Sequence, residues 1–384
     1  MYPDLSYILH ALFGTDPDNI FSIIKTFGLL LGMAFVASGS LLYLELKRRE
    51  STGQFNARIE NVIIHKPIGW QEILTQSAIN FLLAYKIAYI YYHFTEFRAD
   101  PASVIFSSKG NGLWGLIIGG LTAGYWIYKM SRETDKELKR ADVMIHPHQR
   151  VFDITAVAAL SGIIGSKLFS IFENFGDFLQ DPIGNFFSGS GLTIYGGLIL
   201  AFLCVSWYVA KKGLRPLYFM DAASPSLMIG YAVGRMGCHL SGDGDWGIIN
   251  EMPKPTWFFF PDNWWAFSYP HNVLNEGIKI EACQWLHCMQ LTPPVFPTPL
   301  YESILALIIT GILWFFRTRI PYAGVLFFLY CLLNGIERIF IESIRVNPRY
   351  DILGLNPSFA QIIAFLLILT GITGMVYYWK KKIH

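Results

Sequence analysis

Long apolar runs alternate with short polar segments along this chain, and the pattern predicts a bundle of membrane-spanning helices. A helical run of about 20 mostly apolar residues is long enough to cross the hydrocarbon core of a bilayer. We expect such helices near residues 20–45, 70–94, 112–130, 152–174, 191–211, 217–237, 299–317, 321–342 and 357–379. The sequence therefore predicts an all-α polytopic membrane protein with about nine transmembrane helices, in one transmembrane domain over residues 1–384.

Basic residues between the apolar runs predict the orientation of the chain. They cluster after every second expected helix, whereas the other ends carry fewer. The clusters are Lys47-Arg48-Arg49, Lys129 with Arg132, Lys211-Lys212 with Arg215, Arg317 with Arg319, and Lys380-Lys381-Lys382. Because basic loops stay in the cytoplasm, we expect the N-terminus outside and the C-terminus in the cytoplasm. The first twenty residues lack a basic n-region, so no cleaved signal peptide is expected.

The composition agrees with a multi-pass membrane protein. Hydrophobic residues make up 53% of the chain and charged residues 15%, against about 25% charged in a soluble domain. The net charge of +2 says little about partners. Membrane lipid is the expected environment, and no nucleic-acid partner is expected.

An internal repeat is visible at an offset of 81 residues. Residues 62–126 align without a gap over residues 143–207, with 17 identities in 65 positions. The matches include Lys86 over Lys167, Asp100-Pro101 over Asp181-Pro182, Phe106-Ser107 over Phe187-Ser188, and Gly110 over Gly191. We interpret the repeat as a duplicated two-helix unit whose copies keep one orientation and pack as neighbours.

Residues 248–298 form an expected external segment rich in aromatic residues. Such density suits the membrane interface, and a small packed cap with its own core explains it equally well. Cys283 and Cys288 lie in this segment and could form a disulfide in an oxidising compartment. A metal site from these cysteines with His287 is the less favoured alternative, because the spacing matches no common zinc pattern.

The stretch GRMGCHLSGDGDWG at 234–247 contains the densest group of candidate functional residues. It places Arg235, Asp243 and Asp245 where an apolar helix meets the outer surface, and a charge there is costly without a partner or a role. Its glycines, Gly237 and Gly247 among them, allow backbone to approach a bound group. We expect a site for an anionic lipid headgroup.

A second arginine-rich stretch, NGIERIFIESIR at 334–345, lies at the same expected depth. Arg338, Glu342 and Arg345 are spaced so that they share one helix face. They could form an ion ladder that lets a polar helix end enter the membrane. Two arginines on different helices favour a phosphate site instead, because a guanidinium matches phosphate oxygens.

For several other candidate site residues, a structural role is an alternative to a functional one. Tyr195, in GLTIYGGLIL, precedes a Gly-Gly pair that suits close helix packing, or it offers its hydroxyl to a substrate. For Tyr301 and Glu302, in PTPLYES, we favour structural roles as an interface anchor and a first-turn dipole partner. His239 is a candidate base because it is close to Arg235 in sequence.

These segments, in this order, resemble the bacterial prolipoprotein diacylglyceryl transferase family. GRMGCHLSGDGDWG is similar to that family's GRxGNFxNGExxG, and GLTIYGGLI to its xxFHGGLxG. FPTPLYES resembles HPSQLYEA, and NGIERIFIESIR resembles YGxFRFxxExxR. The resemblance covers residues 20–45 and then 150 to the C-terminus, so residues 50–140 look like an insertion made by the duplication.

The resemblance implies transfer of a diacylglyceryl group from phosphatidylglycerol to the lipobox cysteine of a prolipoprotein signal peptide, with release of glycerol 1-phosphate. It implies that Arg235 and Arg338 hold the phosphate and that Glu342 orients Arg338. Further candidate substrate-binding residues are Gly237, Cys238, His239, Asp243, Asp245, Gly247 and Arg345, and Tyr195 is a further candidate catalytic residue. No metal or cofactor is implied, and the expected location is the bacterial cytoplasmic (inner) membrane.

The chain departs from the family pattern on the acceptor side. Tyr195 stands where the family has His, Cys238 where it has Asn, and Phe296 where it has the His of HPSQLYE. One inserted residue leaves either Asp243 or Asp245 in place of the signature's Glu. The alternatives are therefore a lipid-headgroup enzyme with a different acceptor, and a non-catalytic lipid-binding or transport protein.

Overall fold

A computed structural model describes residues 1–99, 104–105, 107–133, 137–182, 193–347 and 356–382. It contains two compact units. The first comprises residues 1–55, 147–155 and 209–384, and the second comprises residues 56–146 and 156–208. Of the repeat matches, those at Asp100-Pro101, Phe106, Phe187-Ser188 and Gly191 fall outside the described residues.

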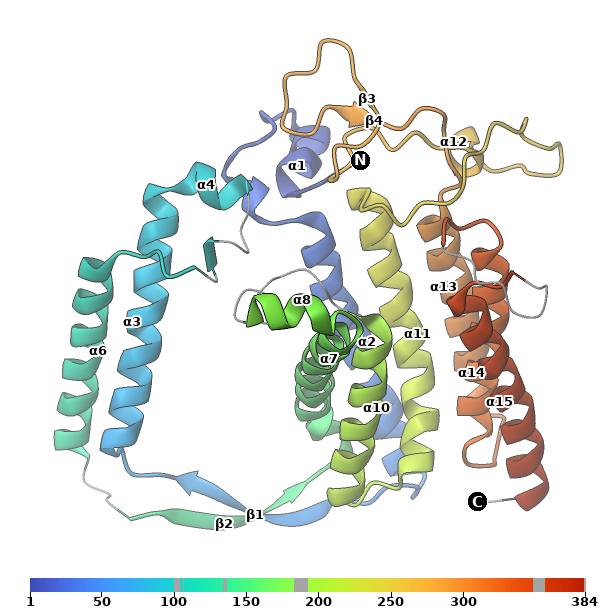
Figure 1. Ribbon diagram of the computed structural model, residues 1–384. Helices are drawn as coiled ribbons and strands as arrows, with labels where there is room; N and C mark the ends of the chain where they lie inside the picture. The colour runs from blue at the N-terminus through green and yellow to red at the C-terminus, as the bar shows by residue number, and fades with distance from the viewer. Residues whose placement is uncertain (100–103, 106, 134–136, 183–192, 348–355, 383–384) are drawn as a thin grey trace. The chain divides into compact units, whose positions relative to one another are not determined.

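Each predicted apolar run coincides with a long helix (Figure 1). These helices are α2 (Thr26–Ser51), α3 (Trp70–Tyr92), α6 (Gly112–Arg132), α7 (Val151–Glu173), α10 (Ile194–Lys211), α11 (Pro216–Ser241), α13 (Thr298–Phe316), α14 (Val325–Glu342) and α15 (Phe359–Lys381). Among the described residues, 6 helices are long and apolar enough to cross a membrane. The prediction of a helical membrane protein is confirmed. α11 and α14, which carry charged residues of the candidate site, are not among these six.

The first unit is built on pairs of packed helices. α2 lies along α11, and α13, α14 and α15 lie side by side (Figure 1). Between α11, α13 and α14, a core forms around Met228, Ala306 and Leu313. The buried Asp221 of α11 accepts hydrogen bonds from the backbone N–H groups of Gly324 (2.7 Å) and Phe327 (2.8 Å). These bonds satisfy donors at the start of α14 that the helix itself leaves open.

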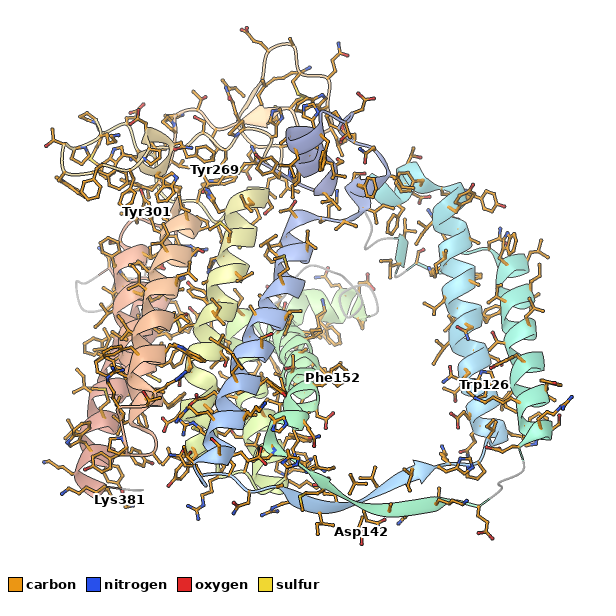
Figure 2. All side chains as sticks on the ribbon, turned by 180° about the vertical axis from the view of Figure 1, so that it is seen from behind. Trp126, Asp142, Phe152, Tyr269, Tyr301 and Lys381 are labelled. Carbon is orange, nitrogen blue, oxygen red and sulfur yellow. A yellow bond between two sulfur atoms is a disulfide. The ribbon has the colours of Figure 1, made fainter. Side chains whose placement is uncertain are left out.

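Segment 248–298 has little regular structure. It contains α12 (Asp262–Trp265) and a ladder of β3 (Ile278–Lys279) with β4 (Met289–Gln290). The segment is neither a fully packed cap nor a fully exposed aromatic surface, because Tyr269 is completely buried whereas Phe259 is 87% exposed. Figure 2 shows Tyr269 and Tyr301 at the same end of the first unit.

Two short helical elements precede α2 in the first unit. They are α1 (Leu5–Phe13) and the 3-10 turn η1 (Ile20–Ile23). The backbone N–H of Leu286 donates to Asp18, and that of His287 donates to the Tyr7 hydroxyl (3.1 Å). The N-terminal residues are therefore bound to segment 248–298.

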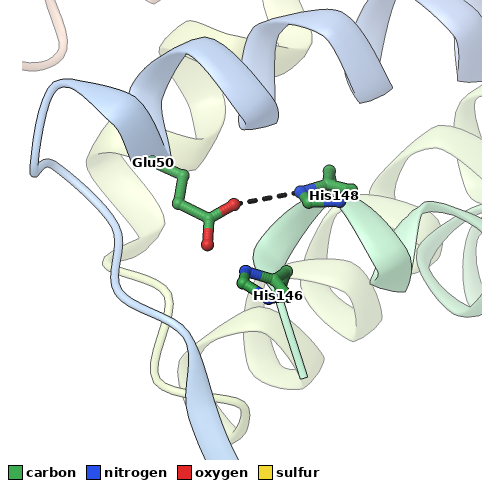
Figure 3. A group of neighbouring side chains, drawn as sticks. All are labelled: Glu50, His146 and His148. Carbon is green, nitrogen blue, oxygen red and sulfur yellow. Dashed lines mark hydrogen bonds and ion pairs between the residues drawn. The ribbon is translucent and has the colours of Figure 1, made fainter. Parts of the chain in front are cut away.

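Ion pairs hold the other end of the first unit together. Glu45 is fully buried and pairs with Arg48, Arg49 and Arg317. Figure 3 shows Glu50 of α2 turned toward His148 of the short turn η2 (Pro147–Arg150), at 3.0 Å. Through Arg317 and His148, the end of α2 contacts residues that lie far from it in sequence.

The second unit contains two helix pairs and a two-stranded ribbon. α3 packs along α6, and α7 packs along α10 so closely that a Cβ added at Gly197 would lie 2.2 Å from Ser166 Oγ. The packing explanation of the Gly-Gly pair is thereby confirmed. Short helices α4 (Phe94–Ala99) and α8 (Phe175–Gln180) follow α3 and α7. Lys86 donates to the backbone carbonyls of Val104 and Lys109, so its ammonium group has hydrogen-bond partners within the unit.

The ribbon was not predicted from the sequence. β1 (Arg58–His65) pairs antiparallel with β2 (Lys139–Ile145). Asn61 lies opposite Asp142 and donates to it at 2.9 Å, and these two residues are separated by the offset of the repeat. The segments that lead into the two proposed copies therefore pair about this position.

Candidate functional site

The candidate site lies where three helices of the first unit bring charged side chains together. Arg235 comes from α11, Glu302 from α13, and Arg338 from α14. Arg345 follows the end of α14 and completes what we call the arginine cluster: Arg235, Arg338 and Arg345. The side chains of Arg235, Arg338 and Arg345 are 13%, 21% and 12% exposed, so each guanidinium group needs nearby negative charge or a ligand.

Glu302 is the centre of this cluster. Its carboxylate is fully buried and lies 3.1 Å from Arg235 Nε, 2.9 Å from Arg338 and 3.3 Å from Arg345. The hydroxyl of Tyr231 also donates to it, at 3.1 Å. One carboxylate therefore fixes the relative positions of three guanidinium groups.

This position corrects the interpretation of Glu302 as a first-turn dipole partner. α13 begins at Thr298, and its first turn contains no acidic residue. The role of Glu302 depends on α11, α13 and α14 converging, and no pattern within PTPLYES contains that information. Its neighbour Tyr301 donates a hydrogen bond to the Trp264 carbonyl, which links α13 to segment 248–298.

Asp245 is the second shared carboxylate of the cluster. It forms ion pairs with both Arg235 and Arg345, and its side chain is 32% exposed. The neighbouring backbone holds it in place, because Thr298 Oγ1 donates to the Asp245 carbonyl at 2.7 Å. Of the two acids in the signature, Asp245 is the one that contacts the arginines.

Arg345 is positioned in the cluster by a backbone contact that the helical spacing did not predict. α14 ends at Glu342, so Arg345 is not on a helix face with Arg338. A β-bridge between Gly247 and Arg345 brings it back instead. A Cβ at Gly247 would lie 2.5 Å from the Ile344 carbonyl oxygen, so the bridge requires glycine at this position.

Glu342 supports Arg338 from its own helix. It lies 3.2 Å from the Arg338 guanidinium and accepts a hydrogen bond from Ser358 Oγ at 2.7 Å. Asn347 also donates to it. Glu337, on the same helix, is 4% exposed, and its carboxylate oxygens accept no hydrogen bond from the described residues.

Cys238, Asp243 and His239 lie beside the arginines. Ligand atoms of Cys238, Asp243 and Asp245 are within 4.8 Å of one another, a spacing that a metal ion could use. The two guanidinium groups on Asp245 oppose a cation there, which favours an anion site. Burial raises the pKa of Asp243, which lies just beyond α11. His239 Nδ1 is 3.2 Å from the Tyr269 hydroxyl.

Gly237 of α11 and Tyr195 of α10 are the remaining predicted site residues. Gly237 packs against α2, where an added Cβ would be 3.0 Å from Leu30 Cβ. Tyr195 belongs to α10 of the second unit. Cys283 and Cys288 form a disulfide, which excludes the alternative of a metal site from these cysteines and His287.

Comparison with known proteins agrees with these features. The family model of prolipoprotein diacylglyceryl transferase matches residues 134–377. The chain is 27% identical to phosphatidylglycerol–prolipoprotein diacylglyceryl transferase of Leptospira interrogans in an alignment of 271 residues, and the alignment covers 64% of this chain and 74% of that protein. It is 27% identical to the Dehalococcoides mccartyi protein of the same name over 292 residues. This alignment covers 75% of this chain and 96% of that protein. It is 28% identical to the Clostridioides difficile protein of the same name over 249 residues, and this alignment covers 64% of this chain and 84% of that protein.

Proposed function

The chain belongs to the prolipoprotein diacylglyceryl transferase family, because the family model spans more than half of it, and we propose that it transfers a diacylglyceryl group from phosphatidylglycerol to a prolipoprotein cysteine. The observation that carries this proposal for the present chain is the arginine cluster. Three guanidinium groups gather around Glu302 at one end of the membrane helices. That geometry suits a lipid phosphate.

The reaction moves the diacylglyceryl group from oxygen to sulfur. The acceptor thiolate attacks the glyceryl carbon bonded to phosphate oxygen, a C–S bond forms, and the C–O bond breaks. Glycerol 1-phosphate leaves with the bonding electrons, and the thiol proton goes to a base. Arg235 and Arg338 bind the phosphate and stabilise the charge that develops on it. Arg345 extends the same positive surface.

The carboxylates position these arginines. Glu342, held by Ser358, orients Arg338, and Asp245 takes the place of the signature's Glu beside Arg235. Gly247 lets Arg345 reach the site. We assign Cys238 and Asp243 to the substrate-binding surface, because they lie at the end of α11 that carries Arg235. Gly237 supports this end of the helix by letting it pack closely against α2.

Two residues are candidates for the base that takes the thiol proton. Tyr195 stands where the family has His, but a phenol hydroxyl accepts a proton less readily than an imidazole does at neutral pH. His239 is one helical turn from Arg235 and contacts Tyr269. We therefore favour His239. Full activity of Tyr195→Phe together with loss of activity in His239→Gln would support this assignment, and the reverse result would contradict it.

We further propose that nine helices span the bacterial inner membrane, with the N-terminus outside and the C-terminus in the cytoplasm. The basic clusters of the loops support this orientation. The Cys283–Cys288 disulfide also supports it, because disulfides persist in oxidising compartments and segment 248–298 would face outward. The acceptor is then a signal peptide whose lipobox cysteine reaches the outer surface.

We also propose that residues 62–126 and 143–207 are copies of one two-helix unit. The pairing of Asn61 with Asp142 supports the duplication. So does the burial of Ile73 and Ile154, which are aligned in the repeat.

The decisive experiment follows radiolabelled glycerol lipid from phosphatidylglycerol to a lipobox peptide with the purified protein. We expect labelling that requires the peptide cysteine and is lost in Arg235→Ala. Lys25→Ala is the control, since this residue contacts Asp4 away from the cluster. Bound phosphatidylglycerol without transfer would instead favour a lipid-headgroup enzyme with another acceptor, or a lipid-binding protein.

A further inference from the structure

A cavity of about 460 Å³ lies in the first unit, next to the end of α11. Tyr7, His10 and Ala11 of α1 line it, together with Trp285 of segment 248–298 and His239 of α11. Its volume is within the range of sites that hold small ligands, about 300–1,000 Å³. It is therefore large enough for a few residues of an extended chain and too small for a folded partner.

The lining favours an uncharged ligand with amide groups. Trp285 is surrounded by the rings of Tyr7, His10 and His271, at centroid distances of 5.6, 5.0 and 4.8 Å. The described residues that line the cavity include no Asp, Glu, Lys or Arg, and the α-amino group of the lining residue Met1 donates to the Pro270 carbonyl at 2.6 Å. Aromatic faces bind apolar groups, and imidazole nitrogens can donate to a carbonyl or accept from an N–H. A short peptide offers both kinds of group.

Two residues that line the cavity neighbour residues of the arginine cluster. His239 lines the cavity and is one helical turn from Arg235. Trp264 also lines it, and the Trp264 carbonyl accepts a hydrogen bond from Tyr301, the residue before Glu302. A chain bound in the cavity would therefore have its next residues close to the phosphate-binding arginines.

The backbone beside the cavity is held in an unusual conformation. Tyr269 and His271 are not glycines, yet their φ angles are +43° and +59°. Such conformations persist where surrounding structure enforces them, and they are frequent at binding sites. The fully buried Tyr269 contacts His239, and His271 lines the cavity. The fold thus enforces the shape of this wall.

From these observations we propose that the cavity binds the few residues that follow the acceptor cysteine in the prolipoprotein. This inference rests on the proposed function, because that function supplies a polypeptide acceptor whose sulfur must reach the lipid. The residues before the cysteine are in the membrane, so the residues after it emerge at the end of α11, where the cavity lies. Aromatic rings bind their side chains, and imidazoles bind their backbone.

The test compares two acceptor peptides with the same apolar segment. One ends at the cysteine as an amide, and the other continues for four uncharged residues. We expect the wild-type protein to use the longer peptide with about tenfold higher kcat/KM. Ala11→Trp, which fills the cavity, should remove this preference while leaving the rate with the short peptide and the KM for phosphatidylglycerol unchanged.

Leu12→Trp is the matched control. Leu12 is the next residue of α1, is 68% exposed and does not line the cavity, so this variant should keep the wild-type preference. Equal use of both peptides by the wild-type protein would overturn the inference, as would an equal loss with both peptides in Ala11→Trp. If Ala11→Trp does not fold, the wild-type comparison alone decides. Failure to transfer to either peptide would refute the proposed function itself.

Discussion

Replacing Glu302 by Gln tests whether this residue holds the arginine cluster together. The change keeps the size of the side chain but removes the one carboxylate that lies within 3.3 Å of all three guanidinium groups. Loss of one partner from a buried ion pair costs about 3–5 kcal/mol. Asp245 and Glu342 still pair with the arginines, so we expect the lower end, about 3 kcal/mol.

This magnitude predicts two measurable effects. At about 2 °C per kcal/mol for a chain of this size, the melting temperature in detergent should fall by about 6 °C. Misplaced arginines also lose transition-state contacts. Because removal of one donor to a developing oxyanion typically costs about 10²-fold or more in rate, kcat/KM for transfer should fall by at least about 100-fold.

Glu337→Gln is the matched control for this prediction. Glu337 is also buried, but its carboxylate oxygens accept no hydrogen bond from the described residues, and it forms no ion pair there. Because the Gln substitution removes no ion pair or hydrogen bond with the described residues, stability should stay the same or rise. If Glu302→Gln melted and reacted like the wild type, or if Glu337→Gln were the more damaging change, the assignment of Glu302 as the centre of the cluster would be wrong.

Three further predictions concern neighbouring features. Gly247→Ala should lower activity about tenfold or more, since its Cβ would crowd Ile344, whereas Gly234→Ala, whose Cβ meets no atom within 4 Å, should be tolerated in the same transfer assay. Asp245→Asn should tighten inhibition by inorganic phosphate about tenfold, because it removes a competing anion from Arg235 and Arg345; unchanged inhibition would contradict this. Burial lowers the pKa of His271 below its ordinary 6.5, so the folded state binds fewer protons and stability is lost as pH falls below about 6.5. Melting temperatures at about pH 7 and pH 5.5 should therefore differ more in the wild type than in His271→Gln.

The hydrophobic pattern predicted the helices well for a physical reason. Bilayer thickness sets the length of an apolar run, so the run itself locates the helix. The β1–β2 ribbon was missed because its pairing joins residues 58–65 to residues 139–145, and such long-range pairing leaves no local periodicity. The positions of Arg235 and Arg338 were predictable, because charges in apolar helices stand out.

The carboxylate partners were harder to predict than the arginines. Glu302 lies in a segment that looks like an ordinary helix start, and its importance comes from neighbours on α11 and α14. The choice between Asp243 and Asp245 also needed geometry, because the inserted residue makes both fit the motif. Arg345 was predicted to lie near Arg338, and it does. The predicted reason, a shared helix face, was wrong, because a β-bridge beyond the end of α14 positions Arg345.

The charge balance of the cluster suggests how a phosphate enters it. Three guanidinium groups are paired with Asp245, Glu302 and Glu342, so formal charges cancel before lipid binds. Glu302 and Glu342 are buried and held by further hydrogen bonds, whereas the Asp245 side chain is 32% exposed. We infer that phosphate replaces Asp245 at Arg235 and Arg345 and that Asp245 returns when glycerol 1-phosphate leaves. Exchanging one anion for another spares the arginines an unpaired state, which would be costly this close to the membrane.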